Sequence, residues 1–130
     1  MKILIVDDDK TTRKLLSYYL KENGFTVITA ENGLDGMEKL GSDAVSLVMT
    51  DLNMPFMDGI EFIKTMKSNP GISQIPALML TAETDGEEQE RAFKAGADGY
   101  LSKPVTAEEV VTKIRQMLEE ALKKGEKPHA

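Results

Sequence analysis

The 130-residue chain contains no cysteine and only one histidine, His129. Without cysteine the chain can form neither a disulfide framework nor a thiolate metal site, and a single histidine cannot make a histidine cluster. Any metal that side chains bind here must therefore be held by oxygen ligands.

The chain also lacks a long apolar run. No apolar stretch approaches the roughly 20 residues that span a bilayer. Residues 1–6, which are apolar except for Lys2, meet three consecutive aspartates too early to form the core of a signal peptide. We therefore expect a cytoplasmic protein that does not insert into membranes.

Positive charge is in short supply, because 16 Lys and Arg stand against 22 Asp and Glu, for a net charge of −6. This balance opposes direct binding to nucleic acid, whose phosphates must be neutralised by basic side chains. A content of 41% hydrophobic and 29% charged residues is ordinary for one globular domain of this length.

Short apolar runs alternate with amphipathic stretches along the chain. The runs cover 2–7, 25–29, 44–50, 77–81 and 98–101, and the stretches cover 10–22, 33–41, 58–67, 85–95 and 106–122. This alternation predicts five βα units, and hence an open parallel sheet between two helical layers.

Capping signals support these boundaries. Asp58 with Glu61, and Thr106 with Glu109, place a capping oxygen and an acid three residues later, whereas Asn32 is a weaker helix start. We expect one domain over residues 1–122. Residues 123–130 have no hydrophobic period and are expected to form a polar tail without regular structure.

Polar residues follow four of the predicted strands. The first strand ends in Asp7-Asp8-Asp9, the third in Thr50-Asp51, the fourth in Thr81, and the fifth runs into Ser102-Lys103. The carboxyl ends of parallel strands meet at one edge of the sheet, where open α/β proteins bind ligands. We therefore expect carboxylates, a hydroxyl and an ammonium to converge there.

Like charges about 4 Å apart repel by roughly 4 kcal/mol at an effective dielectric near 20, so Asp7, Asp8 and Asp51 together need a counter-ion. Oxygen ligands suit Mg²⁺ and disfavour zinc, so Mg²⁺ is the predicted cofactor. A carboxylate beside Mg²⁺, with Lys103 and a hydroxyl nearby, can also take up a phosphoryl group. Asp51 is the candidate nucleophile because Asp7 and Asp8 are adjacent and can share the metal.

Four segments of the chain resemble the signature blocks of response-regulator receiver domains, in particular the CheY-like single-domain members. The segments are Ile5–Asp9, Met49–Gly59, Leu80–Glu83 and Ala95–Pro104, and their order and spacing match over residues 1 to about 122. The resemblance implies a doubly wound, flavodoxin-like (βα)5 fold with the strand order 2-1-3-4-5.

The resemblance also implies a role for each site residue. Asp51 would accept a phosphoryl group from a sensor histidine kinase or phosphotransfer protein. Mg²⁺ would be bound by Asp8, Asp51 and the backbone carbonyl of Asn53, with Asp7 acting through a water molecule. Lys103 would pair with the phosphoryl oxygens.

The same resemblance implies a switch in which the Thr81 hydroxyl moves toward the phosphoryl group and Tyr100 turns inward. The face formed by helix four, strand five and helix five would then bind a downstream target. Asn53 and Glu83 occupy the two positions that tune dephosphorylation. The chain would be a signalling protein that catalyses only its own phosphorylation and dephosphorylation.

The chain departs from many relatives at Val105, where phenylalanine is common after Lys103-Pro104. That dipeptide is compatible with a cis bond.

Other interpretations of these residues and of the whole chain stay open. The three aspartates can also serve as helix caps, and Tyr100 can be a half-buried strand residue. The chain could be a receiver module of a longer regulator with a DNA-binding or enzymatic output domain, and a homodimer is possible. An aspartyl-phosphate phosphatase is less favoured because Asn53 replaces the second acid that such enzymes carry.

Overall fold

The computed structural model describes residues 1–82 and 85–125, in which strands and helices alternate. In chain order the elements are β1 (Lys2–Val6), α1 (Lys10–Glu22), β2 (Thr26–Ala30), α2 (Gly33–Ser42), β3 (Leu47–Thr50), α3 (Gly59–Lys67), β4 (Ala77–Thr81), α4 (Gly86–Ala95), β5 (Gly99–Ser102) and α5 (Ala107–Gly125). The strands form one parallel sheet in the order β2-β1-β3-β4-β5. The predicted βα units and strand order are confirmed.

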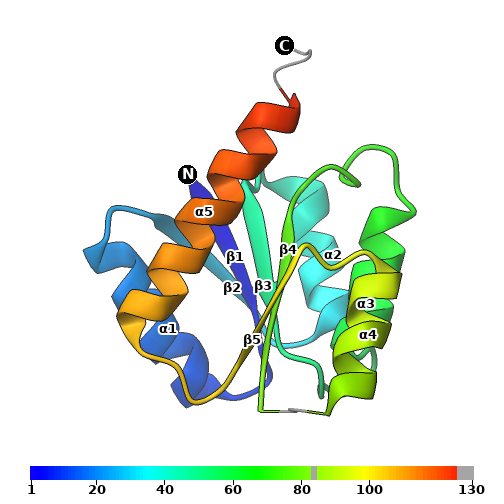
Figure 1. Cartoon of the computed structure of the whole chain (residues 1–130), viewed down its shortest axis with the longest axis horizontal. Helices are drawn as coiled ribbons and strands as arrows, with labels where there is room; N and C mark the ends of the chain where they lie inside the picture. The colour runs from blue at the N-terminus through cyan, green and yellow to red at the C-terminus, as the bar shows by residue number, and fades with distance from the viewer. Residues whose placement is uncertain (83–84, 126–130) are drawn as a thin grey trace.

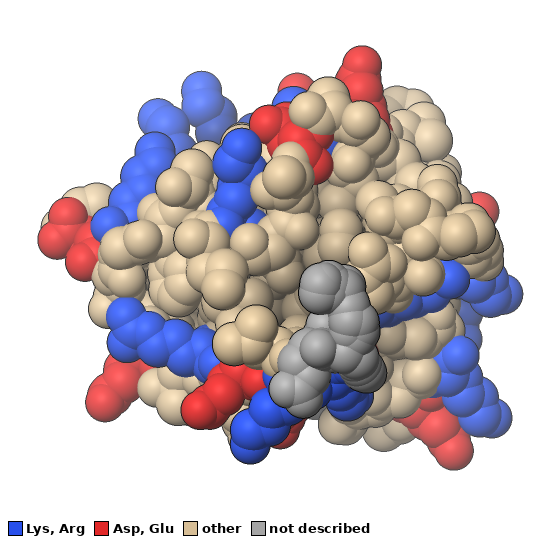
Figure 2. All heavy atoms as spheres, turned by 90° about the horizontal axis from the view of Figure 1, so that it is seen from above, with Lys and Arg blue, Asp and Glu red and all other residues tan. Residues whose placement is uncertain are grey.

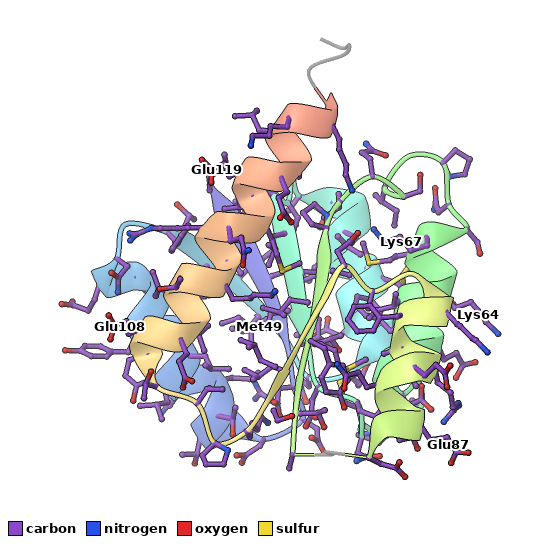
Figure 3. All side chains as sticks on the ribbon, in the orientation of Figure 1. Met49, Lys64, Lys67, Glu87, Glu108 and Glu119 are labelled. Atoms are coloured by element: carbon purple, nitrogen blue, oxygen red, sulfur yellow. The ribbon has the colours of Figure 1, made fainter. Side chains whose placement is uncertain are left out.

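The sheet is covered on both faces, because successive residues of a strand point to opposite sides. In β1, Ile3 and Ile5 pack into a core with α1 and α5, whereas Leu4 and Val6 pack into a second core with α2, α3 and α4. Figure 1 shows α1 and α5 on the left side of the strands and α2, α3 and α4 on the right side. Met49 of β3 lies in the layer between the sheet and α5 (Figure 3).

The helix starts follow the predicted caps. The Asp58 carboxylate accepts from the Glu61 amide at 2.8 Å, and Asn32 likewise caps α2. Thr106 and Glu109 form a reciprocal capping box, in which each side chain accepts from the other residue's amide.

Two boundaries differ from the prediction by three residues, and several others differ by one. The β3 strand begins at Leu47 rather than at residue 44, because Ser46 bonds to the backbone of Lys2 and the ladder to β1 opens only with the pair Ile3–Leu47. The α5 helix runs to Gly125, three residues beyond the predicted end at 122. The rest of the predicted tail, residues 126–130, lies outside the described residues.

No helix in the described part of the chain has both the length and the apolar character needed to cross a membrane. Figure 2 views the end of the molecule where α5 finishes. Basic and acidic side chains both lie around the rim of this end, and uncharged residues occupy its centre. The carboxyl ends of the strands lie at the opposite end (Figure 1).

Candidate functional site

The carboxyl edge of the sheet brings three aspartates together. The β1 and β3 strands are in register at Val6 and Thr50, and the Asp51 amide donates to the carbonyl of Val6 at 3.0 Å. Asp7 and Asp51, the next residue of each chain segment, therefore lie side by side. Together with Asp8, they place carboxylate oxygens within 4.8 Å of one another. The predicted convergence of these residues is confirmed.

The three carboxylates differ in environment. Asp7 is 3% exposed, and its Oδ1 accepts from the Asp9 amide at 2.9 Å. Asp51 is half-buried, and its Oδ1 accepts from the Leu52 amide at 2.7 Å. Asp8 is exposed. The cluster thus has a buried base and an open side facing solvent.

Lys103 supplies the positive charge of the site. Its Nζ lies 3.1 Å from Oδ2 of Asp7 and 3.6 Å from Oδ2 of Asp51. The residue follows β5, its amide donates to the carbonyl of Thr81 at 2.8 Å, and the Lys103–Pro104 peptide is cis. One ammonium therefore faces two carboxylates.

Burial raises the pKa of Asp7 above its ordinary value, although the Asp9 amide and the Lys103 ammonium act in the opposite direction. The negative charge of Asp51 adds to the rise. Lys103 alone thus does not offset the cost of holding these carboxylates together. A hard divalent cation with carboxylate and water ligands fits this donor set, since no sulfur or imidazole belongs to the cluster.

Asp9 has a separate role. It caps α1, accepting from the Thr12 amide at 3.3 Å and from the Thr12 hydroxyl at 2.5 Å. The hydrogen bond from that hydroxyl lowers the pKa of Asp9. Helix capping therefore accounts for the third aspartate of the run, whereas Asp7 and Asp8 join the cluster.

The two predicted switch residues lie on β4 and β5. Thr81 ends β4, is 1% exposed and pairs in register with Ser102. Tyr100 is half-buried and packs against the core on the α4 side, with its ring centroid 6.4 Å from that of Phe93. Tyr100 is thus a half-buried strand residue in this conformation.

The remaining predicted site residues are Asn53 and Glu83. Asn53 is exposed, on the loop after β3. Glu83 lies outside the described residues. Val105 packs against the core between the sheet, α1 and α5.

Sequence reasoning missed two features. The Arg13 guanidinium donates to the backbone carbonyl of Asp7 at 2.7 Å, so a second cation adjoins the cluster; its place one turn into the helix after the aspartates was a usable signal. Phe56, five residues after Asp51, is 80% exposed and has a φ of 69°. Nothing in the sequence indicates this conformation, which bulky residues rarely adopt.

Comparison with known proteins agrees with this geometry. The family model of the response regulator receiver domain matches residues 3–115. The chain belongs to this family. The receiver domain is 37% identical over 120 residues to the chemotaxis protein CheY of Pseudomonas aeruginosa, covering 92% of this chain and 97% of that protein.

Two further relatives extend the comparison. The chain is 36% identical to the response regulator MprA of Mycobacterium ulcerans, covering 91% of this chain but only 50% of MprA. A CheY-like receiver domain protein from Methanospirillum hungatei superimposes with a TM-score of 0.88 at 30% identity, covering 95% of this chain and 98% of that one. The chain is therefore similar both to single-domain regulators and to half of a longer one.

Membership places the chain among the receiver domains of two-component signalling. Receiver domains interact with histidine kinases and downstream targets, and they bind Mg²⁺ at an acidic pocket. The cluster of Asp7, Asp8 and Asp51 is consistent with such a pocket.

Proposed function

We propose that this receiver domain is a signalling switch that accepts a phosphoryl group on Asp51 from a histidine kinase or phosphotransfer protein. The observation that carries the proposal is the position of the Asp51 carboxylate. It is half-buried at the carboxyl edge of the sheet, 3.6 Å from the Lys103 ammonium and beside two further carboxylates.

In the transfer step, one carboxylate oxygen of Asp51 forms a bond to phosphorus while the bond from phosphorus to the donor's imidazole nitrogen breaks. The electron pair of that bond leaves with the imidazole. Lys103 stabilises the phosphoryl oxygens, because its Nζ already lies beside Oδ2 of Asp51.

The proposed Mg²⁺ ligands are the carboxylates of Asp8 and Asp51 and the backbone carbonyl of Asn53, with Asp7 acting through a water molecule. When bound, Mg²⁺ neutralises the carboxylates and the negative charge that develops on the phosphoryl group. The half-buried and exposed positions of Asp51 and Asp8 suit an ion that keeps several water ligands.

Phosphorylation adds about −1.5 to −2 charges at the site. The proposed response is a movement of the Thr81 hydroxyl toward those charges, with Tyr100 turning inward into the space that Thr81 vacates. Tyr100 contacts Phe93 of α4, so its movement changes the face formed by α4, β5 and α5. That face would bind the downstream target.

The side chains of Asn53 and Glu83 would tune the rate at which the acyl phosphate is hydrolysed. The likeness to CheY over nearly the full length of that protein supports a chemotaxis-type signal carried by a short-lived phosphoryl group. The same switch would operate within a longer regulator, and the match to half of MprA supports that second possibility.

The proposal is tested by incubating the protein with acetyl phosphate, with and without Mg²⁺, and measuring its intact mass. We expect one phosphoryl adduct that requires Mg²⁺, is absent in Asp51→Asn, and is removed by hydroxylamine as an acyl phosphate. Asp43→Asn is the matched control, because Asp43 pairs with Lys2 away from the cluster. An adduct on Asp51→Asn, or none on the wild type, would refute the assignment.

A further inference from the structure

A groove of about 740 Å³ lies between α1, the outer strand β2 and α2. Five of its lining residues are basic, and among the described residues no Asp or Glu lines it; the basic residues are Lys10, Arg13, Lys14 and Lys21 of α1 and Lys39 of α2. On a chain with a net charge of −6, this is a local concentration of the opposite sign.

Lys10, Arg13 and Lys14 of α1 are not explained by the stability of the helix, whereas Lys21 lies in the last turn, where a cation is favourable. The amino end of a helix carries a partial positive charge, which favours acids in the first turn and disfavours cations. The first turn of α1 contains no acid, and Lys10, Arg13 and Lys14 all lie in its amino-terminal half. The Arg13 guanidinium donates a hydrogen bond to the Asp7 carbonyl, but Lys14 and Lys21 are exposed along the groove.

The floor of the groove is the open edge of the sheet, because among the described strands β2 pairs with β1 alone. The Thr26 amide and the Ala30 carbonyl bond toward β1. In a parallel ladder the alternate residues, Val27 and Thr29, direct their backbone groups outward. The outward carbonyl of Thr29 accepts from Lys39 Nζ at 3.2 Å.

Lysine on an open edge discourages pairing with neutral or basic strands. Lys39 also pairs with Asp35, whose Oδ1 lies 3.3 Å from Nζ. An acidic strand differs from a neutral one, because its carboxylates can compete for this ammonium and free the Thr29 carbonyl for a backbone hydrogen bond. We propose that an extended acidic polypeptide segment of a partner protein adds to the β2 edge, with its carboxylates paired to the basic residues of the groove.

The charge of the whole chain favours a short acidic segment over a long polyanion. A nucleic acid or an anionic membrane extends beyond the groove and meets a surface of net negative charge, whereas a short segment ends within the groove. An open strand edge also offers alternating backbone donors and acceptors, which match another polypeptide.

The test is fluorescence anisotropy with a short labelled peptide of alternating Glu and Val, added to unphosphorylated protein. We expect saturable binding that weakens as salt rises toward about 0.5 M. The charge reversals Lys14→Glu and Lys21→Glu together should weaken binding by about tenfold or more. The same peptide with alternate amides N-methylated should lose binding, because it cannot pair with the strand edge.

The matched control reverses two lysines outside the groove, Lys64→Glu and Lys123→Glu, and should bind as the wild type does. Lys64 points from α3 away from the body of the molecule (Figure 3).

Three outcomes would overturn the proposal. If both double variants weaken binding equally, the peptide responds to the net charge of the protein and not to the groove. If the N-methylated peptide binds as tightly as the unmethylated one, the peptide does not pair with the strand edge. Tighter binding to phosphatidylserine vesicles or duplex DNA, lost with Lys14 and Lys21, would assign the groove to those ligands instead. Because Asp51→Asn protein can be used throughout, failure here is distinct from failure of the phosphorylation assignment.

Discussion

At the scale of single residues, three consecutive aspartates have three different environments. Asp7 is buried beside Lys103, Asp8 is exposed, and Asp9 caps α1. The difference follows from where β1 ends. Asp7 keeps the position of a strand residue and donates its amide to the carbonyl of Ala30, whereas Asp9 already directs its carboxylate at the first turn of the helix. Chemical identity alone therefore does not determine the role of an aspartate.

We predict that Asp7→Asn stabilises the metal-free protein. Burial raises the pKa of Asp7, so its charged form is less favourable in the folded chain than in the unfolded one. An asparagine removes the charge, and Lys103 keeps Asp51 as a partner. Urea unfolding in the presence of EDTA should show a higher midpoint for the variant.

The pH dependence of this difference has a definite sign. The proton that the folded wild type holds on Asp7 contributes stability that is complete below the ordinary carboxyl pKa and is lost as pH rises through the raised pKa. The advantage of Asp7→Asn should therefore be greatest near neutral pH and shrink in acid. A lower midpoint at neutral pH would mean that the ion pair with Lys103 outweighs the cost of burial.

At the scale of elements, the site depends on how closely α3 approaches the end of β3. Gly59 begins α3, and its amide donates to the carbonyl of Leu52 at 2.7 Å. A Cβ at this position would collide with the backbone carbonyl oxygen of Asp51 and lie 2.9 Å from Cα of Leu52. The absence of a side chain at Gly59 thus allows the backbone that carries Asp51 to sit against the helix.

We predict that Gly59→Ala destabilises the fold by about 2–3 kcal/mol, because backbone atoms must shift to admit the methyl group. The same shift should slow phosphorylation of Asp51. Gly41→Ala is the control, because a Cβ there meets nothing within 4 Å and α2 should gain about 0.5–1 kcal/mol from the better helix former. Thermal unfolding and the rate of adduct formation measure both effects. A Gly59→Ala protein as stable as the wild type would contradict the close approach.

The elements also show what the sequence can and cannot predict. The starts of α3 and α5 were predictable because capping is local, as at Asp58 and Thr106. The start of β3 was not, because it depends on how Ser46 meets Lys2 from a distant strand. The helix α5 continues to Gly125, and Lys123 and Lys124 are favourable near its carboxyl end, although the apolar period ends earlier.

The members of the site were predictable for a similar reason. A parallel sheet gathers the ends of its strands, so Asp7, Asp51, Thr81 and Lys103 had to meet at one edge. The distances within the cluster were not predictable. That Lys103 lies nearer to Asp7 than to Asp51 depends on side-chain packing across 96 positions of sequence.

At the scale of the whole molecule, the carboxylate cluster adds local repulsion to a chain that already carries a net charge of −6. A cation that binds only the folded state stabilises it by mass action. We predict that Mg²⁺ raises the midpoint of thermal unfolding, with a gain of about 2.7 kcal/mol at a hundred times its dissociation constant.

The controls separate site binding from general screening of charge. NaCl at matched ionic strength should reproduce only a small part of the rise, since screening acts on exposed charges throughout the surface. Asp51→Asn and Asp8→Asn should each lose most of the Mg²⁺ effect, whereas Asp43→Asn should retain it, because Asp43 pairs with Lys2 outside the cluster. If Mg²⁺ stabilises all of these proteins equally, the cation acts on the overall charge of the molecule and the three aspartates do not form its site.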